Sequence, residues 1–192
     1  MGSNYLTDPA VFLIQVVFGL FALIVMLRFL LQLMRADFYN PLSQFVVKAT
    51  SPVLRPLRRV IPGVGGIDVS SLLLAWLVKT VELLLIYLVS GFGFLILQSL
   101  VLAIPELIAL TINIFLFSIL VLVILSWVSP SGHNPAYSLL HDLTAPLLTP
   151  VRDRLPPMGG LDLSPMVVMV GLVLLKMLLL PPLEALARQI VA

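Results

Sequence analysis

Residues 50–71 read TSPVLRPLRRVIPGVGGIDVSS, and residues 144–165 read TAPLLTPVRDRLPPMGGLDLSP. A shift of 94 residues superposes the two stretches without a gap. Most of the identical positions are Pro, Gly, Asn, Asp or Thr, which an apolar composition alone would not match. We therefore infer an internal duplication in which each unit is a helix, a patterned loop and a second helix.

The repeated loop residues predict helix caps, stops and turns. Asn40 can cap a helix that accepts Pro41 in its first turn. Because the residue before a proline is pushed out of α geometry, we expect one short helix over about 41–49 and another that opens at Pro52. The glycines permit turns, and Asp68 can cap the next membrane helix. The loop motif consists of Asn40, Pro41, Thr50, Pro52, Pro62, Gly65, Gly66 and Asp68, with Asn134, Pro135, Thr144, Pro146, Pro156, Gly159, Gly160 and Asp162 in the second copy.

The composition predicts a membrane protein. The chain is 60% apolar and 10% charged, whereas soluble domains carry about 25% charge. Four apolar runs reach the roughly 20 residues that a spanning helix needs. They cover 10–34, 69 to about 89, 106–128 and 163 to about 183. A shorter apolar piece at 92–104 fits a connector or an extension of the second helix, with a short fifth span as the alternative.

The predicted fold class is an all-α membrane protein with four transmembrane helices in two parallel helix–loop–helix repeats, whose loops contain short amphipathic interfacial helices. The first repeat is expected at 10–89, a connector at 90–105 and the second repeat at 106–183. Four spans make the repeats parallel, related by a pseudo-two-fold axis along the membrane normal. Lys and Arg gather in loop 35–68 and, more weakly, in loop 129–162. The positive-inside rule therefore places both loops in the cytoplasm and both termini outside.

Charged residues inside the predicted spans are candidate functional positions because each is costly in a bilayer. Glu82 and Lys176 occupy equivalent positions of the two repeats and carry opposite charges. We expect them to approach each other across the repeat interface, with Lys79 competing for the carboxylate. Outward-facing positions or an oligomer contact are the alternatives. Arg28 lies near the loop end of the first span and can reach the headgroups.

The first loop contains a basic amphipathic segment. Its apolar residues recur at helical spacing, which suits a helix in the headgroup layer with its arginines near lipid phosphates. The candidate anionic-lipid contacts are Arg55, Arg58, Arg59 and Arg152. The plainer interpretation is a rigid turn that sets the angle between two spans. The alternative is that both loops form a docking surface or a constriction.

Several classes of site are not predicted. The chain has no cysteine, which excludes disulfides and thiolate chemistry. His133 and His141 do not form a metal-ligand pattern, and the PGVGG stretch lacks the ending of a phosphate-binding loop. The basic patch is too small for a nucleic-acid surface. No catalytic set, cofactor site or metal site is expected.

The two quoted loops, with the preceding RADFYNPLSQFVVKA and NPAYSLLHDL stretches, resemble the YggT (YlmG-like) family of small membrane proteins. The resemblance covers nearly the whole chain. It implies a two-repeat protein of the bacterial cytoplasmic membrane of a Gram-negative organism. Family members are linked to osmotic or extracytoplasmic stress tolerance and to cell division or shape. Plastid relatives are linked to cytochrome assembly and nucleoid distribution. Thr149 and Asp153 replace the arginines of the first loop, so the two loops are not expected to bind lipid equally.

The expected function is that of a non-enzymatic inner-membrane protein that supports envelope integrity or osmotic-stress tolerance as a scaffold or assembly factor. The alternative is an ion channel or osmolyte transport component that works as an oligomer. The expected partners are membrane lipid and proteins at the cytoplasmic face, with a homo-oligomer left open and no nucleic acid.

Overall fold

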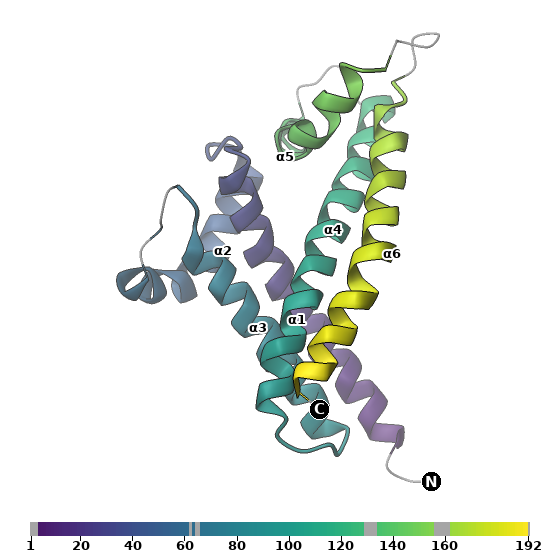
Figure 1. Ribbon diagram of the computed structural model, residues 1–192. Helices are drawn as coiled ribbons and strands as arrows, with labels where there is room; N and C mark the ends of the chain where they lie inside the picture. Colours follow the sequence, from purple (N-terminus) through teal and green to yellow (C-terminus); the bar gives the residue numbers. More distant parts are fainter. Residues whose placement is uncertain (1–3, 62, 64–65, 129–133, 156–161, 192) are drawn as a thin grey trace.

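The computed structural model describes residues 4–61, 63, 66–128, 134–155 and 162–191. The described residues form helices joined by short connections (Figure 1). The helices are α1 (Asn4–Leu33), α2 (Pro41–Val60), α3 (Val69–Val89), α4 (Ile96–Val128), α5 (Pro135–Arg152) and α6 (Ser164–Val191).

Four of these helices, α1, α3, α4 and α6, are long and apolar enough to cross a membrane. At about 1.5 Å rise per residue, even the 21 residues of α3 span the roughly 30 Å of a hydrocarbon core. The chain is therefore a multi-pass membrane protein with an all-helical fold, as the composition predicts. The described part of the chain contains no fifth helix of this kind.

The segment 92–104 differs from the expectation. Residues Ile96–Ile104 are the first turns of α4, and α3 ends at Val89, so this piece neither extends the second span nor forms a span of its own. Pro105 lies inside α4, where a proline removes one backbone hydrogen bond. The helix nevertheless continues through it, and Pro105 is buried. Under the 94-residue shift, α4 matches the whole of α1.

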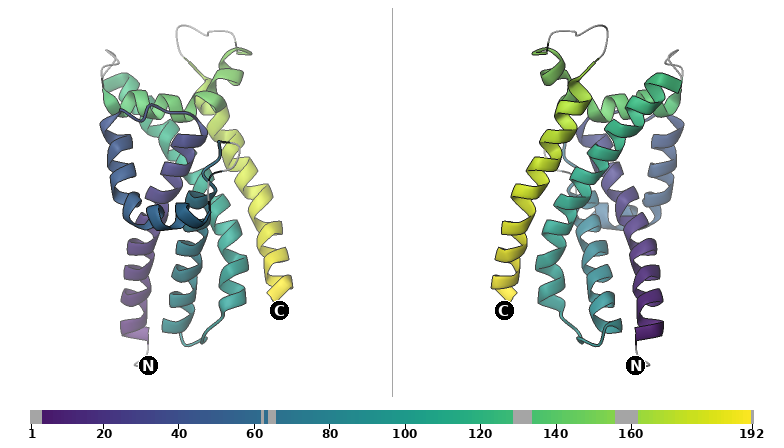
Figure 2. Two further views of the ribbon diagram at one scale, coloured as in Figure 1. Left: turned by 90° about the vertical axis from the view of Figure 1, so that its left-hand side faces the viewer. Right: turned by 90° about the vertical axis from the view of Figure 1, so that its right-hand side faces the viewer.

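The spans alternate in direction. Both termini and the α3–α4 turn lie at one end, and α2 and α5 lie toward the other (Figures 1 and 2). Gly91 and Gly93 in that turn have φ values of 83° and 84°, which side chains with a Cβ rarely adopt. The tight turn brings α4 directly against α3.

Most of the apolar core lies between α1, α3 and α4 and beneath α5. Buried Ala22 and Met26 of α1 pack with Ala75 of α3 and Phe115 of α4. A second cluster joins α4, α5 and α6 around Ile119 and Leu148. The lower halves of α1 and α6 expose apolar side chains, as expected of surfaces in contact with lipid.

The first loop contains one helix where two were expected. Helix α2 continues through Pro52 and Pro56 and bends sharply near its middle (Figure 2). Its first half runs back alongside α1, whereas α5 lies across the end of the bundle. The prolines thus bend the helix without ending it.

Candidate functional site

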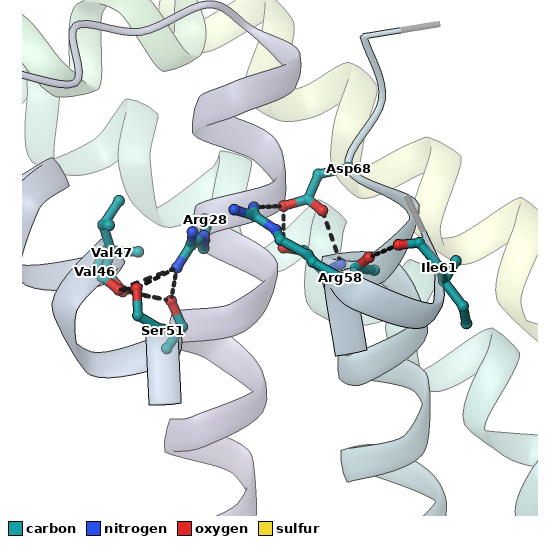
Figure 3. Close-up of polar contacts among 10 residues, drawn as sticks. Arg28, Val46, Val47, Ser51, Arg58, Ile61 and Asp68 are labelled. Atoms are coloured by element: carbon teal, nitrogen blue, oxygen red, sulfur yellow. Dashed lines mark hydrogen bonds and ion pairs between the residues drawn. The ribbon is translucent and has the colours of Figure 1, made fainter. Parts of the chain in front are cut away.

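The strongest polar feature is a cluster of buried side chains where α1, α2 and α3 meet. Arg28 of α1 is buried and points at the middle of α2 (Figure 3). Its Nη1 atom donates to the Thr50 hydroxyl at 2.6 Å and to the Val47 carbonyl oxygen at 3.1 Å. The Ser51 hydroxyl lies 3.3 Å from the same nitrogen. Arg28 therefore fastens α2 to α1 and does not extend to the headgroups as expected.

The same hydroxyl groups explain why α2 bends here. Thr50 Oγ1 donates to the carbonyl of Val46 at 2.7 Å, and Ser51 Oγ donates to that of Val47. Ser and Thr hydroxyls that bond to the preceding turn often bend a helix. Pro52 favours the bend as well, because proline has no backbone N–H to donate to the preceding turn. Thr50 and Ser51 thus stabilise the bend within one continuous helix, where a second helix was expected to open at Pro52.

The second part of the cluster is an ion pair between Arg58 and Asp68. Arg58, on the second half of α2, donates to Asp68, the residue that caps α3. Asp68 also accepts from the backbone N–H of Ser71 at 3.3 Å and from its hydroxyl. Burial alone would raise the pKa of Asp68, but the hydrogen bonds from Arg58 and Ser71 outweigh it and hold this pKa below its usual range.

The second repeat forms the same ion pair. Arg152 donates to Asp162 through Nε at 2.9 Å and Nη2 at 2.7 Å. The Ser164 N–H donates to the other carboxylate oxygen at 2.9 Å. Burial here is slight, and the hydrogen bonds from Ser164 and Arg152 hold the pKa of Asp162 below its usual range. The Asp162 side chain is 42% exposed, against 3% for Asp68.

Arg58 and Arg152, which were predicted to contact lipid, are each bonded to a capping aspartate; their contact with lipid stays a prediction. The duplication could have predicted these ion pairs. Over positions 40–70, Arg58 and Asp68 are the charged residues that are identical in the second copy. Arg55 and Arg59 are exposed, and within the described ranges neither makes an ion pair.

The arginine in the cluster belongs to the first repeat alone. Leu122 occupies the position equivalent to Arg28. Thr144, the equivalent of Thr50, keeps the bond to the preceding turn, at 2.7 Å from the Leu140 carbonyl oxygen. The position of α2 beside α1 follows from this difference, because only the first repeat has a buried cation for the loop helix to bind.

The structure does not form the expected Glu82–Lys176 pair. Both carboxylate oxygens of Glu82 lie 3.0 Å from Lys79 Nζ on the same helix, and Glu106 of α4 lies 3.7 Å from that nitrogen. Lys176 donates to Asn113 at 2.8 Å. Helices α3 and α6 make no contact within the described residues. The expectation assumed spans packed around an axis, whereas these spans lie in a row.

The two asparagines of the loop motif cap helices as expected, and Asn40 also joins the two loops. Asn40 Oδ1 accepts from the Leu42 N–H, and Asn134 Oδ1 accepts from that of Ala136, both at 2.9 Å. Asn40 Nδ2 additionally donates to the Pro135 carbonyl at 2.7 Å, which ties α2 to α5. Gly66 has the positive φ that its position requires. Pro62, Gly65, Pro156, Gly159 and Gly160 lie outside the described residues.

The repeat boundaries are matched by a known family. The model of the CCB3/YggT family matches residues 7–89 and 101–183, each boundary of the second match falling 94 residues after that of the first. The chain belongs to the CCB3/YggT family.

Curated relatives agree with the CCB3/YggT assignment. An uncharacterised Pseudomonas aeruginosa protein is 48% identical and covers 94% of this chain and 92% of its own length. A Vibrio alginolyticus protein, named for a region 3′ of proC, is 42% identical over 84% of this chain and 88% of its own. Escherichia coli K12 YggT is 40% identical over 86% of each. No solved structure matches the chain.

In this CCB3/YggT protein the cluster around Arg28 and Asp68 holds α2 in position against α1 and α3. Every buried side-chain N or O atom in the described part of the chain has a hydrogen-bond partner. No group of three or more His, Cys, Asp or Glu residues within those ranges could hold a metal ion. The cluster fixes the angle of α2 against α1 and α3, and thereby decides which side chains of α2 face outward.

Proposed function

We propose that the chain is a non-enzymatic protein of the bacterial cytoplasmic (inner) membrane that acts through the face formed by α2 and α5. There it works as a scaffold or assembly factor that supports envelope integrity or tolerance of osmotic stress. The observation that carries the proposal is the outer side of α2, where Lys48, Arg55 and Arg59 are exposed. Helix α2 contains no acidic residue that could neutralise them.

The shape of this face supports a contact role. A groove of about 650 Å³ along α2 is lined by Phe38, Gln44, Val47, Lys48, Ser51, Pro52 and Arg55. Cations beside exposed apolar groups suit an acidic partner segment or anionic lipid headgroups. The hydrogen bonds from Arg28 and the Arg58–Asp68 ion pair hold α2 in place, so the groove is preformed.

The proposed topology puts this face in the cytoplasm. The positive-inside rule favours it because the first loop carries most of the basic residues near the span ends. The repeats are then parallel, with both termini outside the cytoplasm. Helix α5 presents Asp142 together with His141 on its side of the face, so this side is less basic than the side of α2.

We expect a photoreactive amino acid at Gln44 to capture a specific protein in native membranes, because Gln44 lies in the groove on α2. The same probe at Leu178, an exposed apolar position on α6, should capture lipid alone. Combined replacement of Lys48, Arg55 and Arg59 by glutamine should lower the capture at Gln44. Crosslinked products are identified by mass spectrometry. Capture of only lipid and self from Gln44 would contradict the scaffold role.

Transport is the second candidate because Lys79, Glu82 and Glu106 place charge within the spans. Against it, Lys79 is paired with both carboxylates, so the described structure leaves no free cation at this site. Two grooves between spans, of about 510 and 440 Å³, have mainly apolar linings. A path for ions would need polar groups with room for water.

We expect purified protein in liposomes to show no ion flux above that of empty liposomes. A fluorescent dye for K⁺ or protons measures the flux, and Glu82→Ala serves as the matched variant. A leak through the wild-type protein that Glu82→Ala abolishes would favour transport over the scaffold role.

A further inference from the structure

The four spans form an open row. Helix α1 contacts α3 and, less extensively, α4; α3 contacts α4, and α4 contacts α6, whereas within the described residues α6 contacts neither α1 nor α3. Both views of Figure 2 show this order in the lower half of the molecule, with α1 and α6 at the two ends. The junction between the repeats is therefore the last span of one repeat, α3, against the first span of the next, α4.

The α3–α4 junction is well defined. The Trp76 indole N–H donates to the Leu100 carbonyl at 2.9 Å, and Lys79 lies 3.7 Å from Glu106. Thr80, one turn from Trp76 on the same side of α3, is buried, as is Leu107 of α4. This contact shows how the last span of a repeat fits the first span of the following repeat.

Equivalent faces exist at both ends of the row and are uncovered. On α6 the equivalents of Trp76, Lys79 and Thr80 are Val170, Val173 and Leu174, which we call the α6 strip. On α1 the equivalents of Leu100, Glu106 and Leu107 are Leu6, Phe12 and Leu13, which we call the α1 strip. All six side chains are exposed.

The exposure of matching residues differs sharply. Thr80 is 7% exposed and its equivalent Leu174 is 53% exposed. Leu107 is 8% exposed and its equivalent Leu13 is 61% exposed. Thus Thr80 and Leu107, which the chain buries, correspond to positions that are left open at the ends of the row.

The two strips are also matched in chemistry. Lys79 and Glu106 form an ion pair at the junction, and both are replaced by apolar residues, Val173 and Phe12, in the strips. Replacement of only one partner would leave an unpaired charge, which costs about 2.5–3.5 kcal/mol at the centre of a bilayer. The paired replacement makes the strips fit each other without a charged residue.

We propose that a second copy of this chain is the partner of these strips, with α6 of one copy packed on α1 of the other as α3 packs on α4. The contact is head-to-tail. Two copies close the arrangement if a two-fold axis along the membrane normal relates them; otherwise the row extends to a larger ring. Association of this kind depends on close packing, since lipid is as apolar as the strips. This inference goes beyond the proposed function and does not depend on it.

Absence of cysteine from the chain permits a crosslinking test without background. Two single variants with different tags, Phe12→Cys and Val173→Cys, are expressed together, and native membranes are treated with a mild oxidant. We expect a reducible product that carries both tags. A ladder of larger products would indicate a ring of more than two copies and would support the same contact.

The matched control replaces Val173→Cys by Leu175→Cys. Leu175 is also an exposed apolar residue of α6, but it lies on the opposite side of the helix from Val170 and Val173. We expect several-fold less mixed product from this pair. Equal yields from the two pairs, or no mixed product from either, would overturn the proposal.

The wild-type protein provides a readout that needs no substitution. Native mass spectrometry from lipid nanodiscs or mild detergent should give the mass of two or more copies. A monomer with bound lipid would mean that lipid alone covers the strips, and that result would also overturn the proposal.

Discussion

Replacement of Asp68 by alanine should lower the free energy of unfolding by roughly 2–3 kcal/mol. Loss of a helix cap costs about 0.5–2 kcal/mol. Breaking a buried ion pair adds to this cost, because the charged side chain that remains stays partly buried without an opposite charge beside it. Arg58 is partly exposed, so it can turn toward solvent, and the added cost is below the 3–5 kcal/mol of a fully buried pair. Unfolding by sodium dodecyl sulfate in mixed micelles, followed by circular dichroism, measures the change.

The second repeat supplies a matched control for this variant. Asp162→Ala removes the same cap and the same kind of ion pair, but that pair is exposed and such pairs contribute about 0–1 kcal/mol. We expect a loss of about 1 kcal/mol, mainly from the cap. Equal losses for the two variants would show that burial of the Arg58–Asp68 pair adds nothing beyond capping.

The pH dependence of the Asp68 effect has a definite sign. Because its pKa is lower in the folded protein, the ionised form favours folding. This contribution is complete above the ordinary aspartate pKa of about 3.9 and is lost as the pH falls through the lowered folded-state pKa. The difference in stability between wild type and Asp68→Ala should therefore be constant near neutral pH and should shrink in acid.

The architecture was largely predictable from local rules. Apolar runs longer than a bilayer thickness predict the spans, and Asn40, Pro41 and Asp68 obey ordinary capping preferences. The Arg58–Asp68 pair was predictable in principle from the duplication, since both members recur together in the second copy. It was missed because each residue had a sufficient separate explanation, a cap for the aspartate and lipid for the arginine.

The path of α2 could not be predicted from local rules. Pro52 predicts a break, whereas the position of α2 depends on hydrogen bonds from Arg28, which lies more than twenty residues from Pro52 on another helix. The Glu82–Lys176 expectation failed for a similar reason. Sequence equivalence shows which positions correspond, but it does not show whether the repeats face each other around an axis or stand side by side in a row.

The differences between the copies therefore carry more functional information than the identities. The shared residues build caps, turns and an ion pair in each repeat. Arg28, Arg55 and Arg59 occur in the first copy alone, and Leu122, Thr149 and Asp153 replace them. The buried arginine sets α2 against α1, and the two exposed ones then lie on its outer side. The three arginines that distinguish the first copy thus have two effects: Arg28 holds α2 in place, and Arg55 and Arg59 give the proposed contact face its positive charge.

Thr50→Val should lower the free energy of unfolding by about 1.5–3 kcal/mol, the range for a hydrogen bond to a charged group. Valine keeps the size and the β-branch, so the change removes the hydroxyl without opening a cavity. The buried Arg28 guanidinium then loses its shortest hydrogen bond, and Thr50 also loses its own bond to the Val46 carbonyl. Chemical unfolding in detergent measures the loss. Faster cleavage by protease within α2 should accompany it, because the hold of α1 on α2 is weakened.

Thr144→Val is the control, since Thr144 makes the equivalent bond to the preceding turn but faces no arginine. Its cost should be at most about 1 kcal/mol, that of a neutral hydrogen bond. Arg28→Leu, which installs the residue found at position 122, completes a double-mutant cycle. In the Arg28→Leu background Thr50→Val should cost no more than Thr144→Val does in the wild type. If the cost of Thr50→Val is unchanged in that background, the hydroxyl does not act through Arg28, and the bend of α2 has another cause.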